Sequence, residues 1–524
     1  MIFNSPRPDV AIPDLPYHEL VLRHAATRPD QVVFIEGTSG RQVTHGDVAG
    51  GARRLAAGLA RRGFGKGDVF AIVLPNVPEY AIAFHGVLMR GGIVTTANPL
   101  YTADELAHQL ADAGARYVVT VPMFLDKVSA AASQAGLKEV FVLGEAAGAT
   151  PFADLLDATG EAPAVAIDPA QDLAVLPYSS GTSGRPKGVM LTHRNLVAVT
   201  AQVDSLRDGP LPEDTRSLAI LPFFHIYGMV VLMNFPLFMG TSCVTLPRFE
   251  IESFLGAIQT HRVTHLYLVP PIVVALAKHP LVARFDLSSV RFINSGAAPL
   301  DEGVQSAVAR QLGAQVAQGY GMTETSLAIA TTPEGEGHGR PGASGQLLPN
   351  MQARIVDTAS GALLGPHQDG EICVRGPNIM RGYLNNPDAT AMTIEPDGWM
   401  HTGDIGHFDD EGYLYVVDRV KELIKYKGMQ VAPSELEGVL LSNPAIADAA
   451  VVPRPDEEAG EIPKAFVVLK GAATEQEVMD FVAARVAPHK KIRAVEFVQQ
   501  LPRSPTGKIL RRVLVEQERA RRAT

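Results

Sequence analysis

The sequence predicts an α/β protein with a large multilobed N-terminal domain of layered, largely parallel sheets and a small α+β C-terminal domain. Three observations support this prediction. Through roughly the first four hundred residues, short apolar runs alternate with segments of helical spacing. In about the last hundred residues, the pattern changes to strands grouped around two helices. The chain has 524 residues, of which 46% are hydrophobic, so it can bury a large core.

The strand–helix alternation is clearest near the N-terminus. Short apolar runs are typical of buried strands, and helices between successive strands are typical of parallel pairing. The elements expected in chain order are a strand at Val69–Leu74, a helix at Pro78–Arg90, strands at Ile93–Thr95 and Arg116–Val121, a helix at Met123–Gln134 and a strand at Val140–Leu143.

A charged run at Asp418–Glu422 follows an apolar strand at Gly412–Val417 and marks the expected domain boundary. We place the large domain at residues 1–418 and the small domain at residues 419–524. Strands of the small domain are expected at Ala449–Val452, Ala465–Leu469 and Val495–Val498.

Two capping boxes predict the helices of the small domain. Ser434 is followed three residues later by Glu437, and Thr474 is followed in the same way by Glu477. In a capping box, the hydroxyl and the carboxylate each accept a hydrogen bond from the other residue's backbone N–H. Apolar residues at helical spacing follow both pairs, so a helix is expected to begin at each.

The charge and cysteine content exclude several classes of protein. Lys and Arg number 46 and Asp and Glu number 56, which gives a net charge of −10. A nucleic-acid-binding protein would need a basic face, so nucleic acid is not expected as a partner. The two cysteines, Cys243 and Cys373, form no CxxC pair, which excludes a disulfide framework and favours a reducing compartment.

The sequence predicts neither a signal peptide nor a transmembrane segment. The N-terminus lacks a charged and then apolar layout, and the C-terminus is not a peroxisomal address. The longest apolar run, Ile226–Gly240, contains Asn234 and Pro236 and is too short to cross a bilayer, so we expect a buried segment. We therefore expect a cytoplasmic protein, either a monomer or a homodimer.

A loop rich in small residues follows the short apolar strand Leu173–Leu176. It has the sequence YSSGTSGRPKG at residues 178–188. Successive backbone N–H groups in such a loop can bind an anion, and glycine lets a phosphate approach the backbone. The loop is not a Walker A motif, because Lys187 lies between Pro186 and Gly188. Its composition alone suits a phosphate site and an ordinary surface turn equally well.

Six further motifs follow this loop along the chain. They are PFFHIYG at 222–228, SGAAPL at 295–300, QGYGMTE at 318–324, WMHTGD at 399–404, DRVKELIKYKGMQVAPSELE at 418–437 and PRSPTGKILRR at 502–512. With all seven motifs in order, the sequence resembles the adenylate-forming superfamily of acyl-CoA synthetases, luciferases and peptide-synthetase adenylation domains. It looks most like the 4-coumarate–CoA ligases and their bacterial relatives.

The resemblance implies an AMP-forming acid–CoA ligase that uses ATP, Mg²⁺ and coenzyme A. In such an enzyme, the carboxylate of the substrate attacks the α-phosphate of ATP, which gives an acyl-adenylate and diphosphate. The acyl group then passes to the thiol of CoA. Because the first step brings two anions together, the site needs cationic side chains and a metal ion.

By resemblance, three of the motifs and the small domain form the nucleotide site. Glu324 would bind Mg²⁺ and Thr323 would contact the α-phosphate. Asp404 and Arg419 would lie at the ribose, where a carboxylate can accept both hydroxyl hydrogens. The nucleotide-binding residues implied are Ser179, Ser180, Gly181, Thr182, Ser183, Gly184, Lys187, Gln318, Gly319, Tyr320, Thr323, Asp404, Arg419, Lys421, Gln430 and Lys508.

The resemblance also implies three catalytic residues and a mobile small domain. Enzymes of this superfamily rotate the small domain between the two steps. Lys508 resembles the lysine that bridges the carboxylate and the α-phosphate during adenylation, and Lys425 lies in the motif used for thioester formation. His225 would position the reacting carboxylate. The residues implied for CoA binding are Arg248, Lys427 and Gly428.

The acyl pocket implied by the resemblance is apolar. Its residues are Tyr227, Val231, Gly296, Ala297, Gly321, Leu327 and Ala328. Plant 4-coumarate–CoA ligases usually carry a Pro–Val pair in place of Leu327 and Ala328 and a small residue in place of Val231. Such methylene-scale differences are worth about 1–3 kcal/mol, enough to change the preferred acid. We expect 4-coumarate or a related aryl acid, with a medium- or long-chain fatty acid as the alternative.

Other functions fit the sequence less well. Transfer to a carrier protein is not expected, because no carrier domain is appended, and a luciferase-type oxidation would depend on a special substrate. A metallohydrolase is not expected, because no HExxH glutamate accompanies His261 and His265. The alternative from another class is a non-catalytic nucleotide-binding scaffold. A scaffold could have lost a catalytic side chain, whereas this chain has Glu324, Asp404, Lys425 and Lys508.

Overall fold

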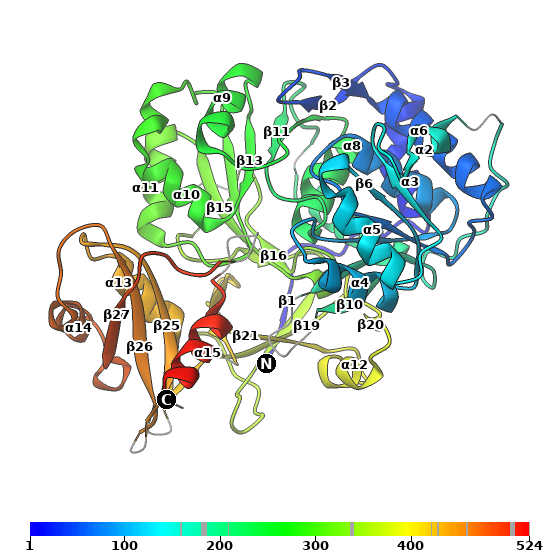
Figure 1. Cartoon of the computed structure of the whole chain (residues 1–524). Coiled ribbons are helices and arrows are strands. Elements are labelled where there is room, and N and C mark those ends of the chain that lie inside the picture. Colours follow the sequence, from blue (N-terminus) through cyan, green and yellow to red (C-terminus); the bar gives the residue numbers. More distant parts are fainter. Residues whose placement is uncertain are drawn as a thin grey trace.

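The computed structural model describes residues 1–157, 160–179, 186–207, 209–335, 340–420, 422–426, 429–456, 459–503 and 509–522, with the side chains of Gln430 and of residues 519–522 left out. Within this part of the chain, the strands form four β-sheets. Three sheets belong to a large N-terminal domain, and the fourth belongs to a small C-terminal domain beside it (Figure 1). The predicted fold class is therefore confirmed.

The first sheet contains the strands predicted near the N-terminus. In spatial order they are β20 (Gly382–Tyr383), β10 (Lys187–Thr192), β9 (Leu173–Ser179), β5 (Ile93–Thr96), β4 (Val69–Ile72), β6 (Ala115–Thr120), β7 (Glu139–Val142) and β8 (Thr150–Pro151). The strands from β9 to β8 are parallel. The helices that cover the sheet are α2 (His45–Arg61), α3 (Glu79–Met89), α4 (Ala103–Asp112) and α5 (Leu125–Gln134).

The central strand β4 is apolar throughout because helices cover both faces of its sheet. Phe70 and Ile72 pack in the core that includes α2 and α3. Val69 and Ala71 pack in a separate core with α4 and α5. Alternate side chains of a strand point to opposite faces, so each face of β4 contributes to a different core. The six elements predicted in this region are present, with ends within two residues of those expected.

The second sheet occupies the other half of the large domain, and its central strands are parallel (Figure 1). In spatial order the strands are β17 (Gln346–Leu347), β16 (Ala330–Thr331), β15 (Gln315–Tyr320), β14 (Phe292–Ser295), β13 (His265–Leu268), β11 (Arg216–Ala219), β12 (Ser242–Thr245), β2 (Val32–Glu36) and β3 (Gln42–Thr44). The other α-helices described in the large domain are α1 (Tyr17–Val21), α6 (Ala153–Leu156), α7 (His193–Asp204), α8 (Phe235–Met239), α9 (Ile251–His261), α10 (Pro270–Lys278), α11 (Glu302–Leu312) and α12 (Pro387–Thr393).

The long apolar run that precedes β12 is a buried segment, as predicted. It forms a π-helix, η3 (Gly228–Asn234), which continues into α8. Every residue of η3 is buried. No helix among the described residues has the length and apolar character needed to cross a membrane. Both cysteines are free and buried.

The third sheet is antiparallel and contains a bulge that bears on the site. Its strands are β1 (Ile2–Asn4), β18 (Gln352–Val356), β19 (Gly370–Arg375), β21 (Met400–Phe408) and β22 (Leu414–Arg419). Cys373 pairs with His401, but Glu371 pairs with Ile405, so β21 carries extra residues between these two pairs. Gly403 lies within the bulge with φ of 71°. A bulge re-aims side chains out of the regular alternation, and this one contains the TGD motif.

The small domain is an antiparallel sheet with helices on both faces. Its strands are β24 (Met429–Val431), β23 (Ile424–Tyr426), β26 (Gly460–Leu469), β25 (Ile446–Asp456) and, parallel to β26, β27 (Ala494–Phe497). Its helices are α13 (Pro433–Leu441), α14 (Glu475–Ala483) and α15 (Arg511–Arg522). Ala449 and Val451 of β25 pack with α13 and α14, whereas Ala450 and Val452 pack with Leu514 of α15. The three strands predicted here are present.

The capping box predicted at Thr474 is confirmed. The Thr474 hydroxyl accepts from the N–H of Glu477, the Glu477 carboxylate accepts from the N–H of Thr474, and α14 begins at the next residue. Both residues are exposed, so no tertiary contact competes for their side chains.

The capping box predicted at Ser434 and Glu437 is wrong, because tertiary contacts take both side chains. The residue before α13 makes no side-chain cap. The Ser434 hydroxyl donates to Asp418 at 3.1 Å. The Glu437 carboxylate accepts from the N–H of Val451 at 2.7 Å and pairs with Arg511 at 2.6 Å. Burial raises the pKa of Glu437 to about 7, so the partner Arg511 is needed to hold its charge.

Candidate active site

A cavity of about 2350 Å³ lies at the carboxyl ends of the parallel strands. Ser179 ends β9, Gly296 follows β14 and Tyr320 ends β15, and all three line this cavity. Ligands of open α/β sheets bind outside the carboxyl ends of the strands. Arg503 and Arg511 of the small domain also line it, so both domains contribute to one site.

Most of the residues expected at the site line this cavity. The fold brings together residues of the phosphate loop, the QGYGMTE motif, the TGD motif and the expected acyl pocket, which lie far apart in the sequence. They are Ser179, Lys187, His225, Tyr227, Val231, Gly296, Ala297, Gln318, Gly319, Tyr320, Gly321, Thr323, Glu324, Leu327, Ala328, Asp404 and Arg419.

Glu324 is a buried carboxylate beside the phosphate loop. It lies in a 3₁₀ turn, η5 (Thr323–Thr325), and is 5% exposed. Its Oε1 accepts from the Ser179 hydroxyl at 2.9 Å and from the Tyr383 hydroxyl at 2.9 Å. The Lys187 ammonium lies 4.3 Å from the centre of the Tyr383 ring. An oxygen ligand for a cation and a positive group for a phosphate are thus held close together.

Asp404 lies in the bulge of β21, and its contacts include Tyr320 and Arg419. It is 6% exposed. Its Oδ2 accepts from the Tyr320 hydroxyl at 2.7 Å, and its Oδ1 lies 3.2 Å from Nε of Arg419, its register partner on β22. Burial and the nearby Asp404 charge raise the pKa of Tyr320 well above its usual value, so this phenol remains a donor at neutral pH. The carboxylate is therefore fixed in orientation.

The expected acyl pocket is apolar, with one polar region. The Tyr227 hydroxyl lies 3.2 Å from the backbone oxygen of Asn294 and 3.4 Å from Oδ1 of its side chain. The amide of Asn294 donates to Thr331 at 3.2 Å. A Cβ at position 296 would approach the Tyr227 ring to 3.0 Å, so glycine keeps this part of the wall open. The pocket offers an apolar wall with hydrogen-bonding groups at one place.

A strained turn forms another part of this wall. A Cβ at Gly321 would lie 1.9 Å from the backbone oxygen of Leu327, so only glycine fits. Ser326 and Leu327 have φ of 59° and 152°, in the region that favours glycine. The Asn378 amide donates to the backbone oxygens of Thr325 and Ala328, each at 2.9 Å, and holds the turn in place. Strain of this kind persists only where surrounding contacts enforce it.

His225 lines the cavity near the expected acyl pocket. Its Nδ1 accepts from the N–H of Tyr227 at 3.3 Å. In the neutral ring this assigns the proton to Nε2, which makes that atom a donor. This leaves Nε2 able to donate to an oxygen atom in the cavity.

Three predicted residues are placed differently from the rest. Gln318 lines the cavity, but its amide is bonded to the backbone of Leu300 and to Gln305, so it holds the loop after β14. Lys425 is exposed on β23 and does not line the cavity. Arg248 is also outside it, exposed and paired with Glu250 at 2.7 Å.

Several predicted site residues lie outside the described part of the chain. They are Ser180, Gly181, Thr182, Ser183, Gly184, Lys421, Lys427, Gly428 and Lys508, and for Gln430 only the backbone on β24 is described.

Sequence reasoning missed Tyr383, Asn294 and Asn378. Tyr383 lies 59 residues from Glu324, and Asn378 lies 50 residues from Ala328. Only the pairing of β20 with β10 brings Tyr383 to the phosphate loop. Asn294 directly precedes the SGAAPL motif, and that adjacency was the one available signal.

Comparison with known proteins agrees with the geometry. Residues 21–384 match the family described as AMP-binding enzyme, and residues 435–508 match the AMP-binding enzyme C-terminal domain. The chain is 46% identical to 4-coumarate–CoA ligase 5 of Oryza sativa subsp. japonica, over 98% of this chain and 96% of that protein.

Solved structures are also similar over nearly the whole chain. The anthranilate CoA ligase AuaEII in complex with anthranoyl-AMP has a TM-score of 0.89 and 26% identity and covers 98% of this chain and 99% of that one. The o-succinylbenzoate CoA synthetase MenE of Bacillus subtilis in complex with ATP and magnesium ion has a TM-score of 0.82 and 29% identity, covering 95% and 99%. The chain therefore belongs to the AMP-binding enzyme family, as an adenylate-forming acid–CoA ligase similar to the 4-coumarate–CoA ligases.

Proposed function

We propose that this enzyme converts a planar aryl acid of the 4-coumarate type to its CoA thioester. A carboxylate oxygen of the acid attacks the α-phosphorus of ATP, diphosphate leaves, and an acyl-adenylate forms. The sulfur of CoA then attacks the acyl carbon, AMP leaves, and the thiol proton is released. The observation that carries this proposal is one cavity whose walls include Glu324, Asp404 and the apolar pocket beside Tyr227.

Two features favour an aryl acid over an aliphatic one. The first is the full-length similarity to 4-coumarate–CoA ligase 5. The second is the pocket, in which an aromatic ring would pack on apolar side chains while a ring hydroxyl met the polar groups of Asn294 and Tyr227. An aliphatic chain would make no hydrogen bond to those polar groups and would not gain the selectivity that a matched ring hydroxyl gives.

We assign Glu324 to the Mg²⁺ ion that enters with ATP. Mg²⁺ prefers oxygen ligands, keeps several waters and is usually held by one or two carboxylates together with phosphates. One buried carboxylate at the end of the phosphate loop fits that requirement. When bound, the ion would neutralise phosphate charge and polarise the α-phosphate. Lys187 and the residues of the phosphate loop would add donors to the phosphates, with Thr323 at the α-phosphate.

We assign Asp404 and Arg419 to the ribose. Asp404 is already oriented by Tyr320 and Arg419, so its carboxylate can accept from the ribose hydroxyls with little reorganisation. Gly319 and Tyr320 would lie beside the adenine, and Gln318 would act through the loop that it holds.

We place the domain boundary between residues 418 and 419 and propose that the small domain changes orientation there between the two steps. Arg503 and Ile509, which flank the segment containing Lys508, line the cavity. Lys425 lies outside it. This asymmetry supports adenylation by Lys508 and a separate role for Lys425 in thioester formation, with Arg248, Lys427 and Gly428 at CoA.

The decisive experiment is a substrate panel with ATP, Mg²⁺ and CoA. 4-Coumarate, cinnamate, anthranilate, octanoate and palmitate are compared by diphosphate release and by acyl-CoA formation. We expect kcat/KM for 4-coumarate to exceed that for octanoate by about 10-fold or more. Asn294→Ala should reduce the preference for 4-coumarate over cinnamate. A preference for the fatty acids would overturn the aryl assignment, and no diphosphate release with any acid would overturn the reaction itself.

A further inference from the structure

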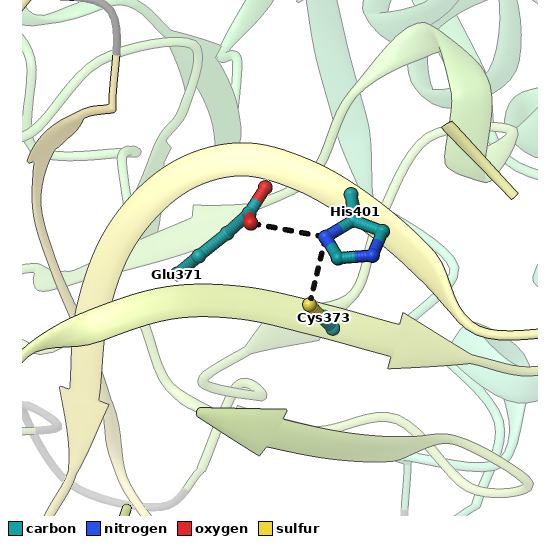
Figure 2. Close-up of side chains that lie close together, drawn as sticks. All are labelled: Glu371, Cys373 and His401. Carbon is teal, nitrogen blue, oxygen red and sulfur yellow. Dashed lines mark hydrogen bonds and ion pairs between the residues drawn. The ribbon is translucent and has the colours of Figure 1, made fainter. Parts of the chain in front are cut away.

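Three side chains with metal-ligand chemistry lie together on β19 and β21, outside the roles assigned above (Figure 2). Glu371 and Cys373 are two residues apart on β19, so they point to the same face. His401 is the register partner of Cys373 on β21 and shares that face. The His401 Nδ1 atom lies 2.9 Å from Oε2 of Glu371 and 3.4 Å from the sulfur of Cys373. A thiol, an imidazole and a carboxylate thus converge on one point.

The other nitrogen of His401 is held by a second carboxylate. Nε2 lies 2.8 Å from Oε1 of Glu395, and Glu395 is in turn paired with Arg354. A carboxylate can only accept, so without a metal ion both ring nitrogens donate, Nδ1 to Glu371 and Nε2 to Glu395. A bound ion would replace the proton on Nδ1, while the N–H at Nε2 would still donate to Glu395. Metal-bound histidines nearly always donate their outer N–H to a carboxylate or carbonyl in this way.

We propose that Cys373, His401 and Glu371 bind one borderline divalent transition-metal ion of the Zn²⁺ type, with a fourth position open to solvent. Sulfur and nitrogen ligands select such an ion over Mg²⁺. With bonds of about 2.0–2.3 Å, tetrahedral ligand atoms are about 3.3–3.6 Å apart. The nitrogen–sulfur distance of 3.4 Å fits, and the nitrogen–oxygen distance of 2.9 Å must widen by about 0.5 Å.

An ion can enter from the large cavity, and the widening of the distance between His401 and Glu371 would involve the TGD turn. Glu371 and His401 line the large cavity, whereas Cys373 is buried at the base of the cluster. Glu371 keeps its other oxygen, Oε1, bonded to the N–H of Gly403 at 3.2 Å, so small rotations of its carboxylate are tied to the TGD turn. An ion here would link β19 to the strand that carries Asp404. The inference does not depend on which acid the enzyme activates.

Co²⁺ is the probe that tests the site, because a thiolate bound to it gives a charge-transfer absorption that exposed carboxylates and histidines do not. The full-length protein is freed of metal with a chelator and titrated with Co²⁺ at about pH 8, where the ion displaces protons from its ligands as it binds. We expect one equivalent to bind with this absorption, and Zn²⁺ to abolish it by displacement. Glu371→Gln should weaken binding by about 10-fold or more.

The second cysteine provides a matched control. Cys243 is equally buried, but on β12, away from the cluster. Cys243→Ala should keep the charge-transfer band and Cys373→Ala should lose it. Zn²⁺ should raise the Tm of the wild type and of Cys243→Ala, but not that of Cys373→Ala. If Cys373→Ala does not fold, Glu395→Gln, which retains all three ligands, should weaken binding by about 10–100-fold.

Three results would overturn the proposal. The first is the absence of the charge-transfer band from the wild type at millimolar Co²⁺. The second is the presence of the same band in Cys373→Ala. The third is a Zn²⁺-dependent rise in Tm that does not require Cys373. Each of these readouts is independent of catalysis. Failure of the substrate panel would therefore leave this result unaffected, and failure of metal binding would leave the proposed reaction unaffected.

Discussion

The Tyr320 hydroxyl donates a 2.7 Å hydrogen bond to Asp404 across 84 residues of sequence, which joins the end of β15 to the bulge of β21. Tyr320→Phe removes that donor and leaves the carboxylate less well oriented. A hydrogen bond to a charged group is worth about 1.5–3 kcal/mol, so we expect KM for ATP to rise by about 10-fold or more with a smaller change in kcat.

Tyr117→Phe provides the control, because the Tyr117 hydroxyl also donates a hydrogen bond, to the backbone of Arg62. Its kinetics should equal those of the wild type. A fall in kcat for Tyr320→Phe with KM for ATP unchanged would contradict the ribose assignment of Asp404.

Glu324→Gln should decrease kcat/KM for adenylation by about 100-fold or more, because the variant keeps the shape but loses the charge proposed to hold Mg²⁺. Tyr383→Phe, which removes only one donor to Glu324, should have a smaller effect of about 10-fold. Both are measured by diphosphate exchange over a range of Mg²⁺ concentrations. Equal Mg²⁺ dependence in Glu324→Gln and the wild type would exclude this ligand assignment.

Lys508→Ala should abolish adenylate formation, whereas Lys425→Ala should spare it and slow thioester formation from preformed adenylate. The reason is that the two lysines would serve different orientations of the small domain. Diphosphate exchange and single-turnover thioester assays separate the steps. Lys138→Ala, at an exposed position of the large domain, is the control. Equal losses in both half-reactions for Lys425→Ala would argue against a two-orientation mechanism.

Gly321→Ala should raise KM for the acid and lower the Tm, because the added methyl would lie 1.9 Å from the backbone oxygen of Leu327. The turn must shift, and with it the wall of the acyl pocket. Gly256→Ala is the matched control, since its Cβ would meet nothing closer than 3.8 Å within α9. That variant should be neutral or stabilised by about 1 kcal/mol. Identical KM values for the two variants would show that the turn does not shape the pocket.

Three buried histidines predict a loss of stability in acid. Burial lowers the pKa of His18 to about 4 and those of His85 and His193 to about 3. In the unfolded chain these groups titrate near 6.5, so below that pH the unfolded state binds more protons than the folded state. The stability that is present above about pH 6.5 is therefore lost as the pH falls. For His85 alone, the loss at pH 5 is about 2 kcal/mol.

The Tm of the wild type should thus decrease between pH 7 and pH 5, and His85→Leu should reduce that decrease. His108→Leu serves as the control, because it removes a histidine from an exposed position on α4 and leaves the buried histidines in place. A pH profile that is the same in all three proteins would show that His85 does not titrate on unfolding.

The sequence predicted the elements whose patterns are local. The alternation from residue 69 to residue 143 predicted the four strands β4, β5, β6 and β7 and the helices α3 and α5, because the apolar runs there face helices on both sides. The box at Thr474 was predicted correctly, since its partners lie within one helical turn. At Ser434 the same pattern gave a wrong prediction, because the side chains of Ser434 and Glu437 bond to Asp418 and Arg511, which come from elsewhere in the chain.

The sequence by itself determined the chemistry available at the site, because the order and composition of the seven motifs are one-dimensional properties. Tertiary structure alone decided which side chains meet. Tyr383 reaches Glu324 through strand pairing between β20 and β10, and a bulge aligns Cys373 with His401 while turning Asp404 toward Tyr320. Hydrophobic periodicity records only which face of an element is buried, whereas these contacts depend on register between segments far apart in the chain.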